Sequence, residues 1–91
     1  MASVIITIKV MPQSPEIDLA SIEAKAAVLI KKTGAELAKH ELEPIAFGLK
    51  ALKLILIADE EKGSTDALEA QIKKIEGVQS VDVVDVRRAI G

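Results

Sequence analysis

Cysteine, tryptophan and tyrosine are missing from this chain of 91 residues. Without cysteine the protein forms no disulfide and binds no metal through thiolates, which is typical of a protein in a reducing cytoplasm. One phenylalanine is the only aromatic residue, so the core must be aliphatic. A basic excess is also missing, since the formal net charge is -2. This charge argues against a general nucleic-acid-binding protein.

Long apolar runs are absent as well. Residues 1–10 lack a charged leader region, and their apolar run is far too short to span a bilayer. We therefore expect no membrane segment, no secretion signal and a cytoplasmic location. We also expect a single domain over residues 1–91, because so small a core is hard to divide in two.

The first half of the chain predicts a strand followed by a helix. Apolar and polar residues alternate over residues 3–11, and the apolar face of this strand carries Val4, Ile6, Ile8 and Val10. Pro12 ends the strand. Asp18 is a suitable helix cap, and Gly34 suits the left-handed position after the last turn. Between them, an apolar stripe recurs every three or four residues, at Leu19, Ile22, Ala26 and Leu29.

The second half predicts two more strands, a helix and a last strand. Residues 35–42 alternate weakly and are polar enough for an edge strand that ends at Glu43-Pro44, whereas residues 49–58 are apolar enough for a central strand. A helix with a buried stripe at Leu68, Ile72 and Ile75 ends at Gly77. The last strand is predicted over residues 78–86, with residues 87–91 as a short tail.

This β-α-β-β-α-β order predicts the α+β class and the ferredoxin-like sandwich. Right-handed crossovers would place both helices on one face of a four-stranded antiparallel sheet. The other face would stay open to solvent or to a partner.

No arrangement of residues typical of an enzyme is present. His40 is the only histidine, and no cysteine or second histidine is available to complete a metal site. The acidic segment at residues 59–61 lacks the spacing of a calcium loop, and residues 63–65 lack the glycine-rich pattern of a phosphate loop. We expect no catalytic residue, no cofactor and no metal.

RNA recognition is a further possibility for such a sheet, because related modules stack bases on aromatic side chains of the central strands. The first and last strands contain no aromatic residue, and the single ring, Phe47, precedes the third strand. Direct contact with nucleic acid is therefore not expected.

Two segments remain as candidates for function. In "EPIAFGLKALKLILIAD" the ring of Phe47 stands at the entrance of a strand. It either packs on the rim of the core, which is the more common fate of an aromatic residue, or forms an exposed anchor. Gly48 favours the anchor, because another backbone can approach a glycine closely. The second segment is "DVRRAIG", in which Arg87 and Arg88 would point to opposite faces of a strand.

Three segments together resemble the archaeal elongation factor 1-beta family: "VIITIKVMPQSPEIDL", "EPIAFGLKALKL" and "GVQSVDVVDVRRAI". The resemblance covers essentially the whole chain, and it also extends to the C-terminal domain of the eukaryotic factor. It implies the ferredoxin-like fold and guanine-nucleotide exchange on the GTPase elongation factor 1-alpha. In the family, the phenylalanine and glycine of a PIxFG motif meet the GTPase, and here the motif is Pro44, Ile45, Phe47 and Gly48.

The chain terminus is the family's other contact, near the nucleotide and Mg²⁺ of the partner, which here implicates Arg87 and Arg88. The eukaryotic domain has a lysine near its terminus, whereas this chain ends Ala89-Ile90-Gly91. Either arginine takes the place of the lysine, or the archaeal form acts without that charge. The alternative is a ferredoxin-like binding or regulatory module without exchange activity. We expect a monomer, because no long exposed apolar strand demands a second copy.

Overall fold

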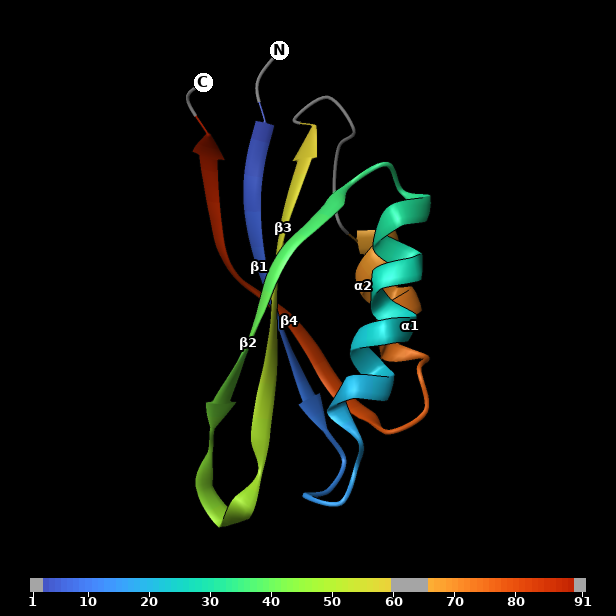
Figure 1. Cartoon of the computed structure of the whole chain (residues 1–91), viewed down its shortest axis with the longest axis vertical. Coiled ribbons are helices and arrows are strands. Elements are labelled where there is room, and N and C mark those ends of the chain that lie inside the picture. The colour runs from blue at the N-terminus through green and yellow to red at the C-terminus, as the bar shows by residue number, and fades with distance from the viewer. Residues whose placement is uncertain (1–2, 60–65, 90–91) are drawn as a thin grey trace.

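A computed structural model describes residues 3–59 and 66–89 of the chain. The elements follow one another as β1 (Ser3–Pro12), α1 (Leu19–Lys32), β2 (Glu36–Pro44), β3 (Lys50–Asp59), α2 (Asp66–Lys73) and β4 (Val78–Ala89). The strands form one antiparallel sheet in the order β2-β3-β1-β4, and both helices lie on the same side of it (Figure 1). The predicted ferredoxin-like fold is confirmed.

The core lies between the sheet and the helices, and it is aliphatic as the composition requires. Strand alternation places Ile6, Ile8 and Val10 of β1 opposite Leu56, Leu54 and Leu52 of β3. All six are buried, and α1 and α2 cover them with Ile22, Ala26, Ile30, Leu68 and Ile72. Among the described residues, no charged or polar side chain is buried.

The ends of α1 agree with the prediction. The Asp18 side chain accepts a hydrogen bond from the backbone N–H of Ala20 at 3.1 Å, and Gly34 has a φ of 90° just beyond the last turn. The buried stripe differs in one position, because Ile30 is fully buried whereas Leu29 is only partly buried against the core. No helix in the described part of the chain is long and apolar enough to cross a membrane.

Two predicted strand ends are wrong. The second strand continues through Pro44, which pairs with Lys50; an edge strand tolerates proline because a missing N–H on the outer side breaks no ladder. The last strand does not end at Val86. It pairs with β1 as far as Ala89, so Arg87 and Arg88 belong to β4 rather than to a tail.

Within residues 3–59 and 66–89, no helix covers the second face of the sheet, and we call it the open face. It carries the residues that alternate with the core: Ile5, Thr7 and Lys9 of β1, Ala51, Lys53, Ile55 and Ile57 of β3, and their register partners, which are Glu36, Lys39, Glu41 and Glu43 of β2 and Asp82, Asp85 and Arg87 of β4. The β2–β3 hairpin lies at one end of this face, and the described end of β4 lies at the other (Figure 1). These two ends contain the candidate residues.

Candidate functional site

The turn between β2 and β3 exposes Phe47 almost completely. A short segment, η1 (Ala46–Gly48), forms the tip of the hairpin, and 94% of Phe47 is accessible to solvent. Packing on the core rim is therefore excluded, and the exposed arrangement is the correct one of the two alternatives. Because the ring is not packed against the rest of the free chain, it gives up no packing when a partner buries it.

The backbone of this turn is strained at Phe47. Phe47 has φ 62° and ψ 31°, Gly48 has φ 78°, and the N–H of Leu49 donates to the carbonyl of Ala46 at 3.2 Å. Two consecutive left-handed residues closed by this hydrogen bond match a type I′ β-turn, which favours Asn-Gly. Phe47 is the only non-glycine residue with positive φ among the described residues. Such strain is typical of functional sites.

Replacing Phe47 by asparagine should therefore stabilise the free chain. Asparagine adopts the left-handed region more easily than phenylalanine, and the exposed ring makes no packing that would be lost. We expect a gain of about 1 kcal/mol in the free energy of unfolding, measured by urea denaturation. Phe47→Ala is the matched control, because it removes the ring without introducing asparagine's preference for positive φ. An equal gain in both variants would contradict an origin in backbone strain.

The other residues of the motif build the turn. Pro44 ends β2, and the N–H of Ile45 donates to the carbonyl of Leu49 at 2.7 Å, which closes the loop above the last strand pair. A β-carbon added at Gly48 would lie 3.9 Å from the β-carbon of Pro15, an ordinary contact. Glycine is thus required at this position by its positive φ rather than by lack of space.

The two arginines lie on opposite faces of β4. Arg87 is paired with Ile5 on the open face, and its Nε donates to Oδ2 of Asp85 at 2.9 Å. Arg88 is paired with Val4, whose side chain packs against the core on the helix side. Of the two, only Arg87 shares a face with the unpartnered surface. Residues 90–91, which belong to the same predicted segment, lie outside the described residues.

The structure does not bring the two candidate segments together. Arg87 is level with Ile5 and hence with Ile57 of β3, whereas the hairpin turn begins beyond Lys50 of the same strand. At the usual rise per strand residue, these two levels are roughly 23 Å apart along β3. β2 and β4 also occupy opposite edges of the sheet. A single partner that contacts both segments must extend along the open face.

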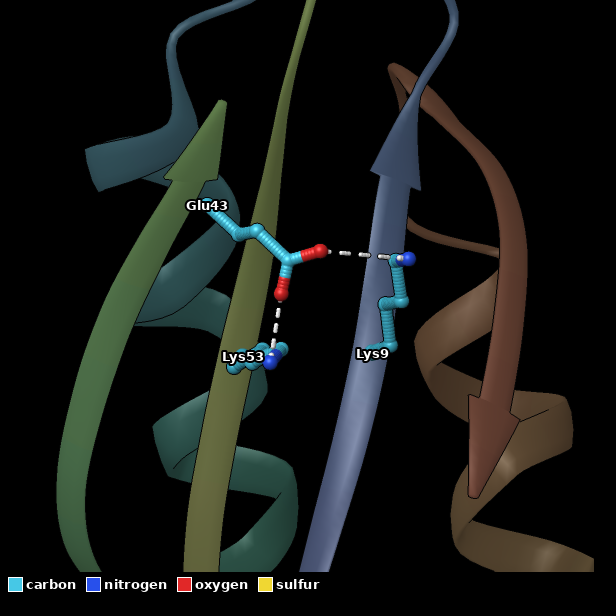
Figure 2. A network of polar contacts seen from close by, with 3 residues as sticks. All are labelled: Lys9, Glu43 and Lys53. Atoms are coloured by element: carbon cyan, nitrogen blue, oxygen red, sulfur yellow. Dashed lines mark ion pairs between the residues drawn. The ribbon is translucent and has the colours of Figure 1, made fainter. Parts of the chain in front are cut away.

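An ion-pair network near the hairpin was not found by sequence reasoning. Oε2 of Glu43 lies 2.5 Å from Nζ of Lys53, and Oε1 lies 3.6 Å from Nζ of Lys9, so one carboxylate joins three strands on the open face (Figure 2). The sequence signal was the presence of Lys9 and Lys53 within otherwise apolar strands. Recognising their common partner required the strand register.

The Glu43–Lys53 pair shifts the pKa of both of its groups. The hydrogen bond and positive charge of Lys53, with a smaller contribution from Lys9, hold the pKa of Glu43 below its ordinary value, and Glu43 in turn raises the pKa of Lys53. Because folding lowers the pKa of Glu43, its contribution to stability is present above the unfolded-state pKa and is lost as the pH falls through the folded-state pKa.

We expect the Glu43 carboxyl group to titrate below the ordinary glutamate value of about 4.3 in an NMR pH titration. Lys53→Gln removes the main cause of the shift, so the midpoint should rise toward the ordinary value. A midpoint that is the same in both proteins would show that the pair does not form in solution.

No other group of side chains among the described residues forms a chemical site. Nδ1 of His40 lies 3.0 Å from Oε2 of Glu23, which links β2 to α1, and half of the His40 side chain is exposed. Among residues 3–59 and 66–89, no three histidine or carboxylate side chains cluster as metal ligands. Residues 60–65, which include most of the two rejected loop sites, lie outside the described residues.

The chain is similar to known proteins in both sequence and fold. The model of a family described as the EF-1 guanine nucleotide exchange domain matches residues 5–89. Elongation factor 1-beta of Methanothermobacter thermautotrophicus is 44% identical over 88 residues, which cover 97% of this chain and 98% of that protein. Elongation factor 1-beta of Staphylothermus marinus is 40% identical over 89 residues, with 97% and 98% covered.

Among solved structures, the ACT domain from GTP pyrophosphokinase of Chlorobium tepidum superimposes with a TM-score of 0.61 at 14% identity, over 90% of this chain and 99% of that chain. The BlrP1 BLUF structure gives a TM-score of 0.60 at 13% identity, over 100% of this chain and 57% of that one. At such low identity these likenesses concern the fold alone, so they give no support to a regulatory module.

Proposed function

Since the chain belongs to the family of EF-1 guanine nucleotide exchange domains, we propose that it binds its GTPase with both ends of the open face, the Phe47 turn and Arg87. The chain is a guanine-nucleotide exchange factor that promotes replacement of GDP by GTP on elongation factor 1-alpha in translation elongation. It is not a catalytic enzyme, because exchange makes and breaks no covalent bond.

The exposure of Phe47 is the observation that supports this proposal most. The only aromatic ring of the chain is 94% exposed at the tip of a strained turn. A free protein gains nothing from this arrangement, whereas an aromatic side chain is a common anchor of protein interfaces. Pro44, Ile45 and Gly48 shape and flank the turn, and in the proposal they form the rest of this contact.

Arg87 is the better candidate for the charged contact at the other end. It lies on the open face, and the carboxylate of Asp85 orients its guanidinium group. In the proposal this end acts on the phosphate and Mg²⁺ region of the partner, in place of the terminal lysine of the eukaryotic domain. Arg88 lies on the helix side and has the smaller role, although both arginines belong to the proposed contact.

Exchange follows from thermodynamic linkage between the two ligands of the GTPase. A factor that lowers the affinity for nucleotide by some ratio is itself bound more weakly, by the same ratio, when nucleotide is present. Each tenfold loosening corresponds to about 1.4 kcal/mol of coupling. GDP then dissociates faster, GTP enters, and the factor is released. The protein needs no cofactor or metal of its own for this cycle.

The direct test is the release of a fluorescent GDP analogue from the cognate elongation factor 1-alpha, followed by stopped flow. We expect the release rate to rise with the concentration of the chain and to reach a plateau. A rate that does not change at saturating concentration would contradict exchange activity.

The assembly and location of the protein are further parts of the proposal. We propose that residues 1–91 act as one exchange domain and as a monomer in the cytoplasm, where translation takes place. The family match over residues 5–89 supports a single functional unit. Light scattering that gives the mass of a dimer would contradict the monomer.

A further inference from the structure

We propose that Glu43 is a positioning residue for exchange: its carboxylate, held by Lys9 and Lys53, sets the direction in which the Phe47 turn leaves the sheet. This inference rests on the proposed function, because it assumes that the turn binds the GTPase. It adds a residue that lies on the open face and outside the motif.

The position of the ring depends on the base of the hairpin. Phe47 has almost no contact with the rest of the chain, and the two backbone hydrogen bonds of the loop join only residues 45–49 to one another. These two bonds do not tie the turn to the sheet, so its direction is set at its base and where Gly48 adjoins Pro15. Over the roughly 10 Å from Pro44 to the tip, a tilt of about 10° at the base would displace the ring by about 2 Å.

Glu43 lies at that base, and both its backbone and its side chain are restrained. It precedes Pro44, and a residue before proline is restricted to extended backbone conformations. Its side chain extends over the open face toward β3 and β1 (Figure 2). Lys53 belongs to the returning arm of the hairpin, so the Glu43–Lys53 pair joins the two arms, and Lys9 joins both to the centre of the sheet.

The carboxylate also separates two like charges. Lys9 and Lys53 are direct register partners on β1 and β3, and like charges placed opposite each other in a sheet destabilise the pairing. Glu43 offsets this repulsion because it contacts both ammonium groups. In its absence the two lysines repel each other beside the hairpin base, while Glu41, the register partner of Lys53, still attracts Lys53.

The test measures GDP release against the concentration of the chain for wild type and Glu43→Gln. We expect the half-saturating concentration to rise about 3- to 10-fold, the order of the cost of losing preorganisation, while the plateau rate stays as in wild type and the chain remains folded at the assay temperature. Glu76→Gln is the control, because it removes the same charge from the exposed turn before β4. It should leave the curve unchanged.

A second substitution distinguishes positioning from direct contact. Lys53→Gln leaves the Glu43 carboxylate in place but removes the ion pair that joins the two arms, so positioning predicts a similar rise in the half-saturating concentration. If Glu43 instead acts by touching the GTPase, Lys53→Gln leaves the curve as in wild type, and that result overturns the proposal. A wild-type curve for Glu43→Gln overturns it as well. A wild-type curve for Phe47→Ala would overturn the placement of the interface itself, which is a separate failure.

Discussion

Replacing Phe47 by alanine should raise the half-saturating concentration for GDP release by about 30-fold or more. Loss of a buried aromatic anchor typically costs an interface about 2–4 kcal/mol, and about 1.4 kcal/mol corresponds to tenfold in affinity. The free chain should keep its circular dichroism spectrum and melting temperature, because 94% of the residue is already exposed. Stopped-flow release of a fluorescent GDP analogue measures the first effect and thermal denaturation the second.

A matched control is available on the other side of the molecule. Val28 of α1 is 55% exposed, so Val28→Ala also removes exposed apolar surface, but far from the open face. We expect its release curve to be that of wild type. An unfolded Phe47→Ala variant, or one with an unaltered curve, would show that the ring is not an interface anchor.

Removing both arginines should weaken exchange in a way that depends on salt. Arg87→Ala with Arg88→Ala should raise the half-saturating concentration by about tenfold at low ionic strength, since charges near an interface act mainly on the association rate. The difference from wild type should shrink as salt is added, because exposed charges are screened over about 10 Å at 0.1 M. Arg87→Ala alone should account for most of the effect, since Arg87 lies on the open face.

The combined variant tests the separation of the two contacts. Effects of sites more than about 10 Å apart usually add within about 0.5 kcal/mol. Phe47→Ala together with both arginine substitutions should therefore multiply the two increases, to about 300-fold or more. Lys25→Ala with Lys74→Ala removes two positive charges from exposed positions on the helix side and should have little effect. A combined variant no worse than Phe47→Ala alone would contradict two separate contacts.

The parts of the fold that local patterns determine were predicted from the sequence. The alternation of Ile6, Ile8 and Val10 identified the buried face of β1, and Gly34 marked the end of α1, because each depends only on neighbouring residues. The end of β4 was missed, since two adjacent arginines resemble a polar tail. They stay in the strand because β1 begins at Ser3 and offers backbone partners as far as Ala89, and such a long-range partner leaves no local pattern.

The sequence singles out the candidate residues but does not determine the geometry in which they lie. One aromatic residue at a strand entrance fits a rim contact, the more common outcome, or an exposed anchor. The left-handed turn that leaves Phe47 94% exposed decides between them. The contacts of Glu43 were missed because they join residues that are far apart in the sequence. The separation of Phe47 from Arg87 follows from the strand register, which the sequence order alone does not determine.

Amide hydrogen exchange with and without nucleotide-free elongation factor 1-alpha tests the two-ended contact most directly. We expect residues 45–49 and residues 85–89 both to become protected in the complex, while α1 and α2 exchange as in the free chain. Protection at only one of these segments, or on the helices instead, would contradict an interface that spans the open face.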